Sequence, residues 1–355
     1  MKNIAIVINN ITLRAGTERA VCNLSNMLSQ SGKYKPYIIS LNSNSGEAAY
    51  KIGNDVKLFH LNLPLYKYKI TRLKLYFSMV NLIKDICIKE NIKIVIGTSS
   101  GINISLFFLK GIIKVIACEH MNYMAASISS RILRKIIYRY LNAVVVLTIS
   151  DSKHYLYLKN LFIIPNSVSF EIKEYSNLSN KVILAIGRLT YQKGFDLLIN
   201  AISLIKDSLN GWEIKIIGSG EDKENLIDQI KYLGLDNMIK LYPSTDNIFQ
   251  EYLNAGFFVL SSRYEGFGIV MLEAHSCGLP VISFNCPVGP SEFINHNIDG
   301  IIVDNGNIKE LSNAILNLIK NEEKRRFLGH NAIKNIEKYK PENIYPLWEN
   351  LIDNL

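Results

Sequence analysis

The sequence predicts an α/β protein with two domains, each built on a parallel sheet with helices on both faces. Its 355 residues suit two domains of roughly 170 residues each. Short β-branched runs alternate with longer segments at helical spacing, and this alternation restarts after a polar stretch in the middle of the chain. Such sheets bind ligands beyond the carboxyl ends of their strands, so we expect the functional loops there, in the cleft between the two domains.

The first domain is expected to span residues 1–165. Its short apolar N-terminus has the length of a strand and is too short for the core of a signal peptide. Helical spacing predicts helices over Thr17–Gln30 and Leu73–Glu90. The predicted strands of this domain are Ile4–Ile8, Tyr37–Leu41, Ile94–Ile96, Val115–Cys118 and Ala143–Thr148.

The second domain is expected to span residues 166–340, after a linker near 165–180 that contains the polar stretch Glu171–Asn180. Residues 341–355 read as a final amphipathic helix. The predicted strands of this domain are Val182–Ile186, Ile214–Ile217, Phe257–Leu260, Val281–Phe284 and Gly300–Val303.

The composition excludes several classes of protein. With 48% hydrophobic and 20% charged residues, the chain is neither disordered nor collagen-like. Its five cysteines are scattered without a CxxC pair, which indicates neither a disulfide framework nor a zinc site, so we expect no metal and a reducing cytoplasm. Lys110 and Lys114 interrupt the apolar stretch from Ile102 to Ala117, and no window is long enough to span a membrane.

The net charge of +9 is unevenly distributed along the chain. Residues 1–170 contain 22 Lys and Arg against 7 Asp and Glu, whereas the remainder contains 18 against 24. A basic half joined to an acidic half indicates that the first half faces a polyanion, either nucleic acid or the anionic cytoplasmic face of a membrane. The composition alone does not choose between them.

Two loops at strand ends carry residues that suit a phosphate. Gly16 precedes a predicted helix, whose N-terminus offers free amides and a favourable dipole, although a glycine of a tight turn explains it equally well. Arg188 and Lys193 lie after the first strand of the second domain, where two cations suit a diphosphate. Taken alone, they read equally as ordinary surface cations.

The segment from Ser261 to Glu273 is the most informative in the chain. It leads from a strand through a glycine turn into a helix, with Glu265 before the turn and Glu273 about one and a half turns into the helix. Each carboxylate can accept hydrogen bonds from a vicinal diol, so the pair suits a ribose and a hexose on either side of a diphosphate, as in a sugar nucleotide. The alternatives are a solvated helix carboxylate for Glu273, and for Glu265 a loop charge paired with Arg263 or Lys193.

These residues resemble a known family. The two glutamates with seven residues between them, within EGFGIVMLEA and before CGLPVI, resemble the E-x7-E signature of family 4 of the retaining glycosyltransferases, which have the GT-B fold of two Rossmann-like domains facing a cleft. The resemblance extends to GRLTYQKGFDLLI at 187–199, IGSGE at 217–221, IIPNSV at 163–168 and AGTERAV at 15–21. Ala15 departs from the double glycine of many relatives.

The resemblance implies a role for each site residue. Arg188 and Lys193 would bind the donor diphosphate, Glu273 the ribose and Glu265 the donor hexose. The catalytic candidates are Glu265, His120, Arg188 and Lys193, with no metal and no cofactor beyond the UDP-sugar donor. The candidates for contacts to phosphate or sugar through the backbone are Gly16, Gly268, Ile269 and Val270.

Two further segments narrow the subgroup. CPVGPSE at 286–292 resembles a motif of members that extend bacterial lipid-linked glycans from UDP-galactose or UDP-N-acetylhexosamine. Glu119 and His120 end a strand of the first domain and resemble an E-H pair near the donor sugar and acceptor, although a histidine at a strand end is also commonly structural. The implied acceptor is a polyprenyl-diphosphate-linked saccharide of O-antigen, capsule or lipopolysaccharide synthesis. The first domain would bind it, and the second would bind the nucleotide sugar.

The basic first half then fits a membrane better than nucleic acid. Residues 66–77 and 131–140 mix cations with aliphatic and aromatic side chains at helical spacing, as in helices that lie on anionic lipid. A helix with its apolar stripe in the core and its basic face in solvent fits either segment as well. A lipid-linked acceptor favours docking, and we expect a cytoplasmic protein on the inner face of the inner membrane.

Other function classes fit less well. A sugar-nucleotide epimerase or hydrolase could use the same two-domain plan and is the main alternative; release of the donor sugar without any acceptor would distinguish it. A nucleic-acid-binding protein would need a recognition helix or a base-stacking motif, and neither is present. No G-x-G-x-x-G follows the first strand, which disfavours a nicotinamide dehydrogenase.

Overall fold

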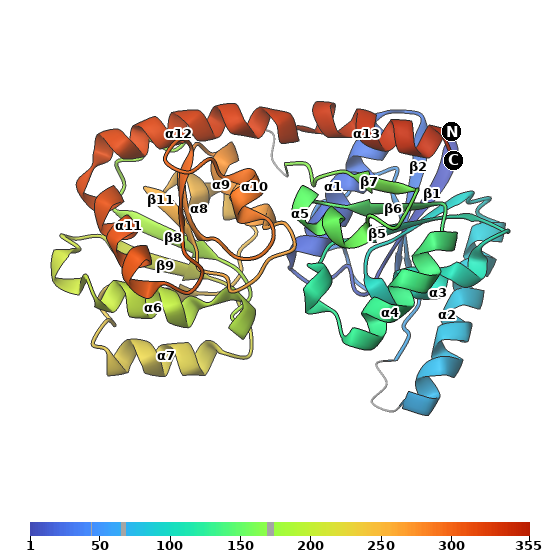
Figure 1. The fold of residues 1–355 in the computed structure, drawn as a ribbon, viewed down its shortest axis with the longest axis horizontal. Helices are drawn as coiled ribbons and strands as arrows, with labels where there is room; N and C mark the ends of the chain where they lie inside the picture. Colours follow the sequence, from blue (N-terminus) through green and yellow to red (C-terminus); the bar gives the residue numbers. More distant parts are fainter. Residues whose placement is uncertain (44, 65–68, 169–173) are drawn as a thin grey trace. The chain divides into compact units, whose positions relative to one another are not determined.

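The computed structural model describes residues 1–355 except 44, 65–68 and 169–173, and the side chains of residues 69–76 are also not described. Internal contacts divide the chain into two units (Figure 1). The first unit contains residues 1–167 together with 341–355, and the second contains residues 168–340. Each unit is built on its own parallel sheet, which confirms the predicted α/β class.

The first unit contains a seven-stranded sheet in the order β3-β2-β1-β4-β5-β6-β7. The order reverses between β1 and β4, so the loops after these two strands diverge at one point of the sheet edge, where ligands bind in open parallel sheets. The strands are β1 (Lys2–Ile8), β2 (Tyr34–Ser40), β3 (Lys57–His60), β4 (Ile94–Gly97), β5 (Lys114–Glu119), β6 (Ala143–Val146) and β7 (Leu161–Ile163).

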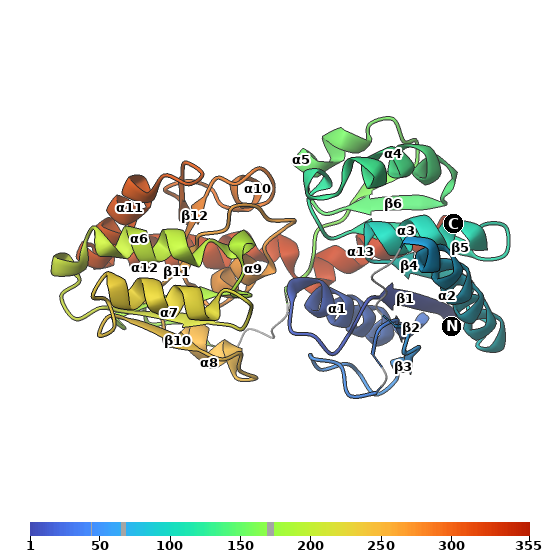
Figure 2. The same cartoon turned by 90° about the horizontal axis from the view of Figure 1, so that it is seen from below.

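Helices cover both faces of this sheet (Figures 1 and 2). Ala5 and Val7 of β1 point into a core that also contains Met79 and Ile102, from helices on one face. These helices are α2 (Lys69–Lys89), α3 (Ser100–Leu106) and α4 (Ile128–Ile137), and α5 (Ile149–Ser152) follows β6. The opposite face is covered by α1 (Gly16–Gln30) and α13 (Pro341–Asp353), which contact each other.

The C-terminal helix α13 is part of the first unit. Trp348 is buried, and Asp353 accepts hydrogen bonds at 3.0 Å from both Lys2 Nζ and Tyr34 Oη. The two ends of the chain therefore meet on the same unit, and the last residues stabilise the first strand.

The second unit contains a six-stranded sheet in the order β10-β9-β8-β11-β12-β13, with its reversal between β8 and β11. The strands are β8 (Val182–Ile186), β9 (Glu213–Ile217), β10 (Ile239–Tyr242), β11 (Phe257–Leu260), β12 (Val281–Phe284) and β13 (Gly300–Val303). In Figure 1, α6 (Phe195–Ser203), α7 (Lys223–Tyr232) and α11 (Ile308–Lys320) lie on one face of this sheet. The other face carries α8 (Ile248–Leu253), α9 (Ile269–Ser276) and α12 (Glu322–Ile336), and α10 (Pro290–Phe293) is a single turn.

Every predicted strand is present, with small differences at its ends. Three strands were not predicted: β3, β7 and β10. Each lies at an edge of its sheet and is partly exposed, so it lacks the continuous apolar run that marks a strand buried on both faces.

Candidate functional site

The loops after β8 and β11 bring two predicted site residues together. These strands are neighbours at the point where the strand order of the second sheet reverses. Lys193 ends the loop after β8, Glu265 lies in the loop after β11, and Lys193 Nζ is 2.6 Å from Glu265 Oε1. Residues 72 positions apart in the sequence thus form one ion pair at the edge where parallel sheets bind ligands.

The Glu265 carboxylate is largely withdrawn from solvent. The residue is 5% exposed, and Oε1 also accepts a 2.6 Å hydrogen bond from Ser262 Oγ. Its cation is Lys193, whereas Arg263 pairs with Asp196 instead. The ion pair expected as an alternative for Glu265 is therefore present, and it joins two residues that were predicted to bind adjacent parts of one ligand.

Helix α9 begins directly after this ion pair. Gly268 precedes its first residue with φ of +79°, a left-handed conformation that favours glycine. Ile269 and Val270 are the first residues of the helix, and the first amides of a helix have no partner within it. The backbone predicted to contact phosphate therefore forms a helix N-terminus, with Glu265 three residues upstream of Gly268.

Glu273 lies deeper than the sequence indicated. It is 1% exposed, so it is not the solvated helix carboxylate considered as an alternative. Its Oε2 accepts a 2.8 Å hydrogen bond from Tyr252 Oη of α8. Tyr252 was not predicted as a site residue, because an aromatic residue in a short amphipathic helix has no feature that distinguishes it from the core.

Arg188 lies on the same loop as Lys193 and is exposed. Within the described part of the chain, no ion pair or side-chain hydrogen bond involves its guanidinium. The neighbouring backbone is tightly packed: a Cβ at Gly218 would lie 1.8 Å from the carbonyl oxygen of Gly187, and one at Gly220 would lie 2.2 Å from that of Leu189. The Arg188 side chain is therefore exposed to solvent, while the backbone of its loop is closely packed.

In the first unit, Gly16 is the first residue of α1, as predicted, and it is exposed. The residue before it, Ala15, has an extended backbone. Ala15 has no side-chain oxygen that could accept a hydrogen bond from the first amides of the helix. The N-terminus of α1 thus follows the loop after β1, one of the two strands at the reversal of the first sheet.

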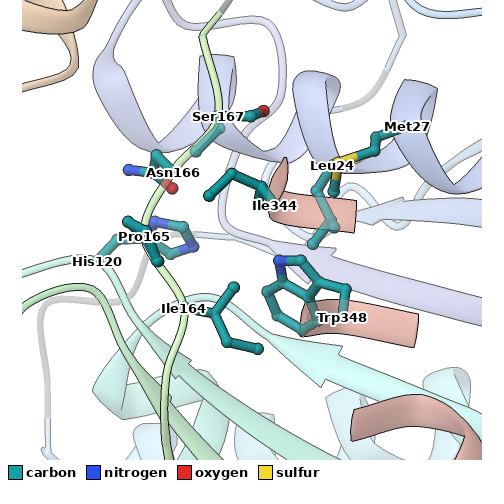
Figure 3. Close-up of a pocket in the computed structure, with 10 residues that line it drawn as sticks. Leu24, Met27, His120, Ile164, Pro165, Asn166, Ser167, Ile344 and Trp348 are labelled. Carbon is teal, nitrogen blue, oxygen red and sulfur yellow. The ribbon is translucent and has the colours of Figure 1, made fainter. Parts of the chain in front are cut away.

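His120 directly follows β5, and its side chain lines a pocket within the first unit (Figure 3). Burial lowers the pKa of its imidazole to about 4, so the ring is neutral at physiological pH. The pocket is lined by α1, α13 and the segment before the second unit, through Ala20, Leu24, Met27, Ile164, Pro165, Asn166, Ser167, Ile344 and Trp348.

Glu119, the residue before His120, belongs to a buried polar network. Its Oε2 accepts a 2.9 Å hydrogen bond from Ser100 Oγ and lies 3.5 Å from a guanidinium nitrogen of Arg134. Its Oε1 accepts hydrogen bonds from Asn103 Nδ2, at 3.1 Å, and from the Tyr138 hydroxyl. The donors come from α3, α4 and the turn after α4, elements with no shared sequence motif, so the network could not be predicted.

The expected orientation of residues 131–140 was wrong for Arg134. Its side chain is fully buried, donating to Tyr155 Oη at 2.7 Å and to the Tyr123 carbonyl oxygen at 3.0 Å. Arg134 is buried as the counter-charge of Glu119, so its side chain cannot contact a membrane. The apolar side chains of α4 point outward instead, and Ile128, Ile132, Leu133 and Ile136 are all exposed. The alternative of a core-facing apolar stripe on this helix is therefore also wrong.

Of residues 66–77, the other expected membrane segment, 66–68 lie outside the described residues, and nothing is described of the side chains of 69–76. Among the helices of the described residues, none is both long and apolar enough to cross a bilayer. In the same part of the chain, no three His, Cys, Asp or Glu side chains gather in a way that could hold a metal ion.

The two Rossmann-like units, with sheets of seven and six parallel strands, have the GT-B fold that the solved structures described below share. The chain belongs to the family described as glycosyl transferases group 1, which residues 169–335 match. It is 31% identical to the amylovoran biosynthesis glycosyltransferase AmsD of Erwinia amylovora, over 99% of this chain and 100% of that protein. It is also 31% identical to the poly(ribitol-phosphate) alpha-N-acetylglucosaminyltransferase of Staphylococcus aureus, over 60% of this chain and 44% of that protein.

Solved structures share the fold at low sequence identity. Anabaena HepE in complex with UDP and glucose has a TM-score of 0.80 and 17% identity, with both chains fully covered. TarM has a TM-score of 0.83 and 19% identity, with 99% of each chain covered. The chain is therefore a glycosyltransferase by family, with relatives in bacterial polysaccharide synthesis.

Proposed function

We propose that the chain transfers a hexose or N-acetylhexosamine from a UDP-sugar to a polyprenyl-diphosphate-linked saccharide of a bacterial surface polysaccharide, with retention of configuration. The observation that carries this proposal is the cluster after β8 and β11, where Lys193 contacts Glu265 and Arg188 lies on the same loop. AmsD, named for amylovoran biosynthesis, supports a polysaccharide product, and HepE, solved with UDP and glucose, supports a UDP-sugar donor.

The donor would bind along this cluster. Its diphosphate is anionic and suits Arg188, Lys193 and the first amides of α9 at Gly268, Ile269 and Val270. Glu265, which contacts Lys193, would accept hydrogen bonds from the hexose, the group adjacent to the diphosphate. Glu273 would accept hydrogen bonds from the ribose hydroxyls on the other side.

In the transfer step, the oxygen of an acceptor hydroxyl bonds to the anomeric carbon of the hexose. The bond from that carbon to the β-phosphate oxygen breaks, UDP leaves with the electron pair, and the proton of the hydroxyl passes to an oxygen of the departing phosphate. Arg188 and Lys193 would stabilise the charge that develops on the departing diphosphate, an effect typically worth about 2–4 kcal/mol in the transition state. We propose that these two cations serve in place of a metal ion.

The first unit would supply the acceptor side of the reaction. His120 is neutral at physiological pH and follows β5, so it can accept or donate a hydrogen bond near the acceptor hydroxyl. Gly16, at the start of α1, offers a helix N-terminus to a phosphate or sugar oxygen.

A panel of UDP-sugars with lipid-linked acceptors tests the activity, with EDTA present and the product anomer assigned by NMR. Arg188→Ala and Lys193→Ala should each lower turnover by about 30-fold to 1,000-fold, the equivalent of about 2–4 kcal/mol, with little change in stability. Lys231→Ala, an exposed lysine of α7, is the matched control. Release of free sugar without acceptor would support the hydrolase or epimerase alternative, and full turnover in both alanine variants would exclude the proposed roles.

We also propose that the first unit docks on the anionic cytoplasmic face of the inner membrane through α4. We define the α4 face as the exposed apolar residues named above together with Arg131, Lys135 and Arg139. Ile128 is 69% exposed, and Ile128, Ile132 and Ile136 recur every fourth residue, with Leu133 beside them. Apolar side chains interspersed with cations are typical of helices that lie in a lipid interface.

An aromatic cluster extends this face. The Phe107 ring lies 6.1 Å from Tyr140 and 5.7 Å from Phe108, and Phe108 lies 5.3 Å from Phe77. Lys110 Nζ lies 5.1 Å from the centre of the Tyr140 ring. Glu119 is the only acidic residue between positions 91 and 150, and it is buried, so this part of the chain presents no acidic side chain that would repel anionic lipid.

Flotation with phosphatidylglycerol vesicles tests the docking. Each cation near the surface contributes about 1 kcal/mol, so replacing Arg131, Lys135 and Arg139 with serine should weaken vesicle binding by about 100-fold or more. The control removes three exposed lysines of the second unit, at Lys206, Lys223 and Lys231. A parent protein that does not float at low salt would exclude docking, and loss of polynucleotide binding instead would support the nucleic-acid alternative.

A further inference from the structure

Arg263 connects the two loops of the proposed donor site. Its guanidinium forms a bidentate ion pair with Asp196 of α6, with Nη1–Oδ1 at 2.8 Å and Nη2–Oδ2 at 2.6 Å. The same Nη1 donates a 2.8 Å hydrogen bond to the Tyr191 carbonyl oxygen, and the guanidinium lies 4.0 Å from the centre of the Tyr191 ring. The Arg263 side chain, in the loop after β11, therefore contacts Tyr191 and Asp196, which lie on either side of Lys193 in the sequence.

Main-chain contacts complete this connection. The Arg263 amide donates to the Gln192 carbonyl oxygen at 2.8 Å, and Ser261 Oγ donates to that of Lys193 at 3.0 Å. Gly194 lies so close that a Cβ there would be 2.1 Å from the Ser261 carbonyl oxygen. The residues beside Lys193 are thus fixed to the loop that carries Glu265.

Three N–H groups of the Arg263 guanidinium donate hydrogen bonds in these contacts, two from Nη1 and one from Nη2. Its planar fork matches the Asp196 carboxylate, and the hydrogen bond from Arg263 to Asp196 raises the pKa of the guanidinium. The side chain of Arg263 is 20% exposed and that of Asp196 is 39% exposed, so the pair lies near the surface, where an ion pair typically contributes up to about 1 kcal/mol to folding stability. An arginine whose charge is paired in this way can still determine where its neighbours lie.

We propose that Arg263 and Asp196 are positioning residues for the donor diphosphate, which they affect by holding Lys193 beside Glu265. This inference rests on the proposed function. A lysine side chain has many rotamers, and its contact with a ligand gains strength when its backbone is fixed beforehand. The proposal requires a defect that depends on the phosphates of the ligand, because in the proposed donor site Lys193 binds the diphosphate and not the nucleoside.

Calorimetric titration with UDP and with uridine tests the proposal. Arg263→Lys keeps the charge but loses the fork, and Asp196→Asn keeps the shape but loses the charge. Each should weaken UDP binding by about tenfold, leave uridine binding within about twofold, and leave the unfolding midpoint unchanged. Because the two residues act as one unit, the double variant should bind UDP no more weakly than either single variant.

Arg326→Lys is the matched control, since Arg326 pairs with Glu322 through Nη2 at 2.8 Å on the exposed surface of α12 in the same unit. It should change none of these quantities. Parent-like UDP affinity in Arg263→Lys would overturn the proposal, and so would an equal loss for UDP and uridine, which would indicate a merely structural role. A parent chain that binds UDP no better than uridine would overturn the proposed donor site itself, and this proposal with it.

Discussion

The two units share a parallel sheet with a strand-order reversal, but they place their charges differently. In the second unit, the ion pairs of Lys193 with Glu265 and of Arg263 with Asp196 lie in the loops after β8 and β11. In the first unit, Glu119 at the end of β5 pairs with Arg134 of α4, and both side chains are buried. One unit thus presents charges at the ligand-binding edge, and the other uses a charge pair inside its core.

The two units also differ in net charge. The first unit contains 22 Lys and Arg against ten Asp and Glu, a net charge of +12, while the second has a net charge of −3. Helix α4 buries Arg134 and exposes Ile128, Ile132 and Ile136, the inverse of an ordinary surface helix. In our proposal, the same sheet architecture supports two tasks, a polar ligand site in the second unit and a docking surface in the first.

Breaking the buried pair of the first unit should have the largest effect. Arg134→Met leaves the Glu119 carboxylate buried without its cation, which typically lowers the free energy of unfolding by about 3–5 kcal/mol. Urea unfolding measures this loss. Lys135→Met, on the exposed side of the same helix, should stay within about 0.5 kcal/mol of the parent. Equal stability of the two variants would contradict the inward orientation of Arg134.

A buried histidine of the second unit should make stability depend on pH. His275 of α9 is fully buried against Phe293, and burial, followed by the charge of Lys338, lowers the pKa of its imidazole to about 3. In the unfolded chain the His275 imidazole has its ordinary pKa of about 6.5. The contribution of the neutral, buried His275 to the free energy of unfolding is therefore complete above about pH 6.5 and is lost as the pH falls toward 3. The loss is about 1.4 kcal/mol per pH unit, or about 2 kcal/mol at pH 5.

The test compares His275→Leu with the parent by urea unfolding between pH 7 and pH 5. As the pH falls, the free energy of unfolding of the variant should decrease less steeply than that of the parent. The difference in slope should be about 1.4 kcal/mol per pH unit, because the unfolded variant binds one proton fewer. His120, with its pKa of about 4, adds a contribution of the same sign in the first unit, which the variant retains. The same substitution at exposed His330 controls for the loss of an imidazole. Parallel curves for parent and His275→Leu would contradict the burial of a neutral ring.

The smallest expected effect concerns Glu273. Glu273→Gln keeps an acceptor oxygen but loses the charge, so UDP should bind about fivefold to tenfold more weakly, the difference between a charge-assisted and a neutral hydrogen bond. Calorimetry with UDP measures it. Tyr252→Phe removes only the hydrogen bond that Tyr252 donates to Glu273. The UDP affinity of this variant therefore shows how much of the effect comes from that internal contact. Unchanged affinity in Glu273→Gln and Glu273→Ala would indicate a purely structural carboxylate.

Much of the fold could be predicted from the sequence, because central parallel strands are buried on both faces and read as continuous apolar runs. Edge strands such as β3 and β10 could not be predicted, since only part of each is buried. The pair of Lys193 and Glu265 was within reach, because both residues follow strand ends. Arg134 was not, since periodicity reveals an amphipathic helix but not which face lies inward, and only the position of Glu119 in the fold decides that.

The central claim is that the nucleotide sugar binds at the strand-order reversal of the second unit. Hydrogen exchange of the full chain, with and without saturating UDP, tests this claim most directly. We predict slower exchange in peptides covering residues 187–194 and 261–273, including the first amides of α9, and no change in α7 of the same unit. Protection confined to the loop between β1 and α1, or no protection anywhere at a UDP concentration that saturates binding, would contradict the claim.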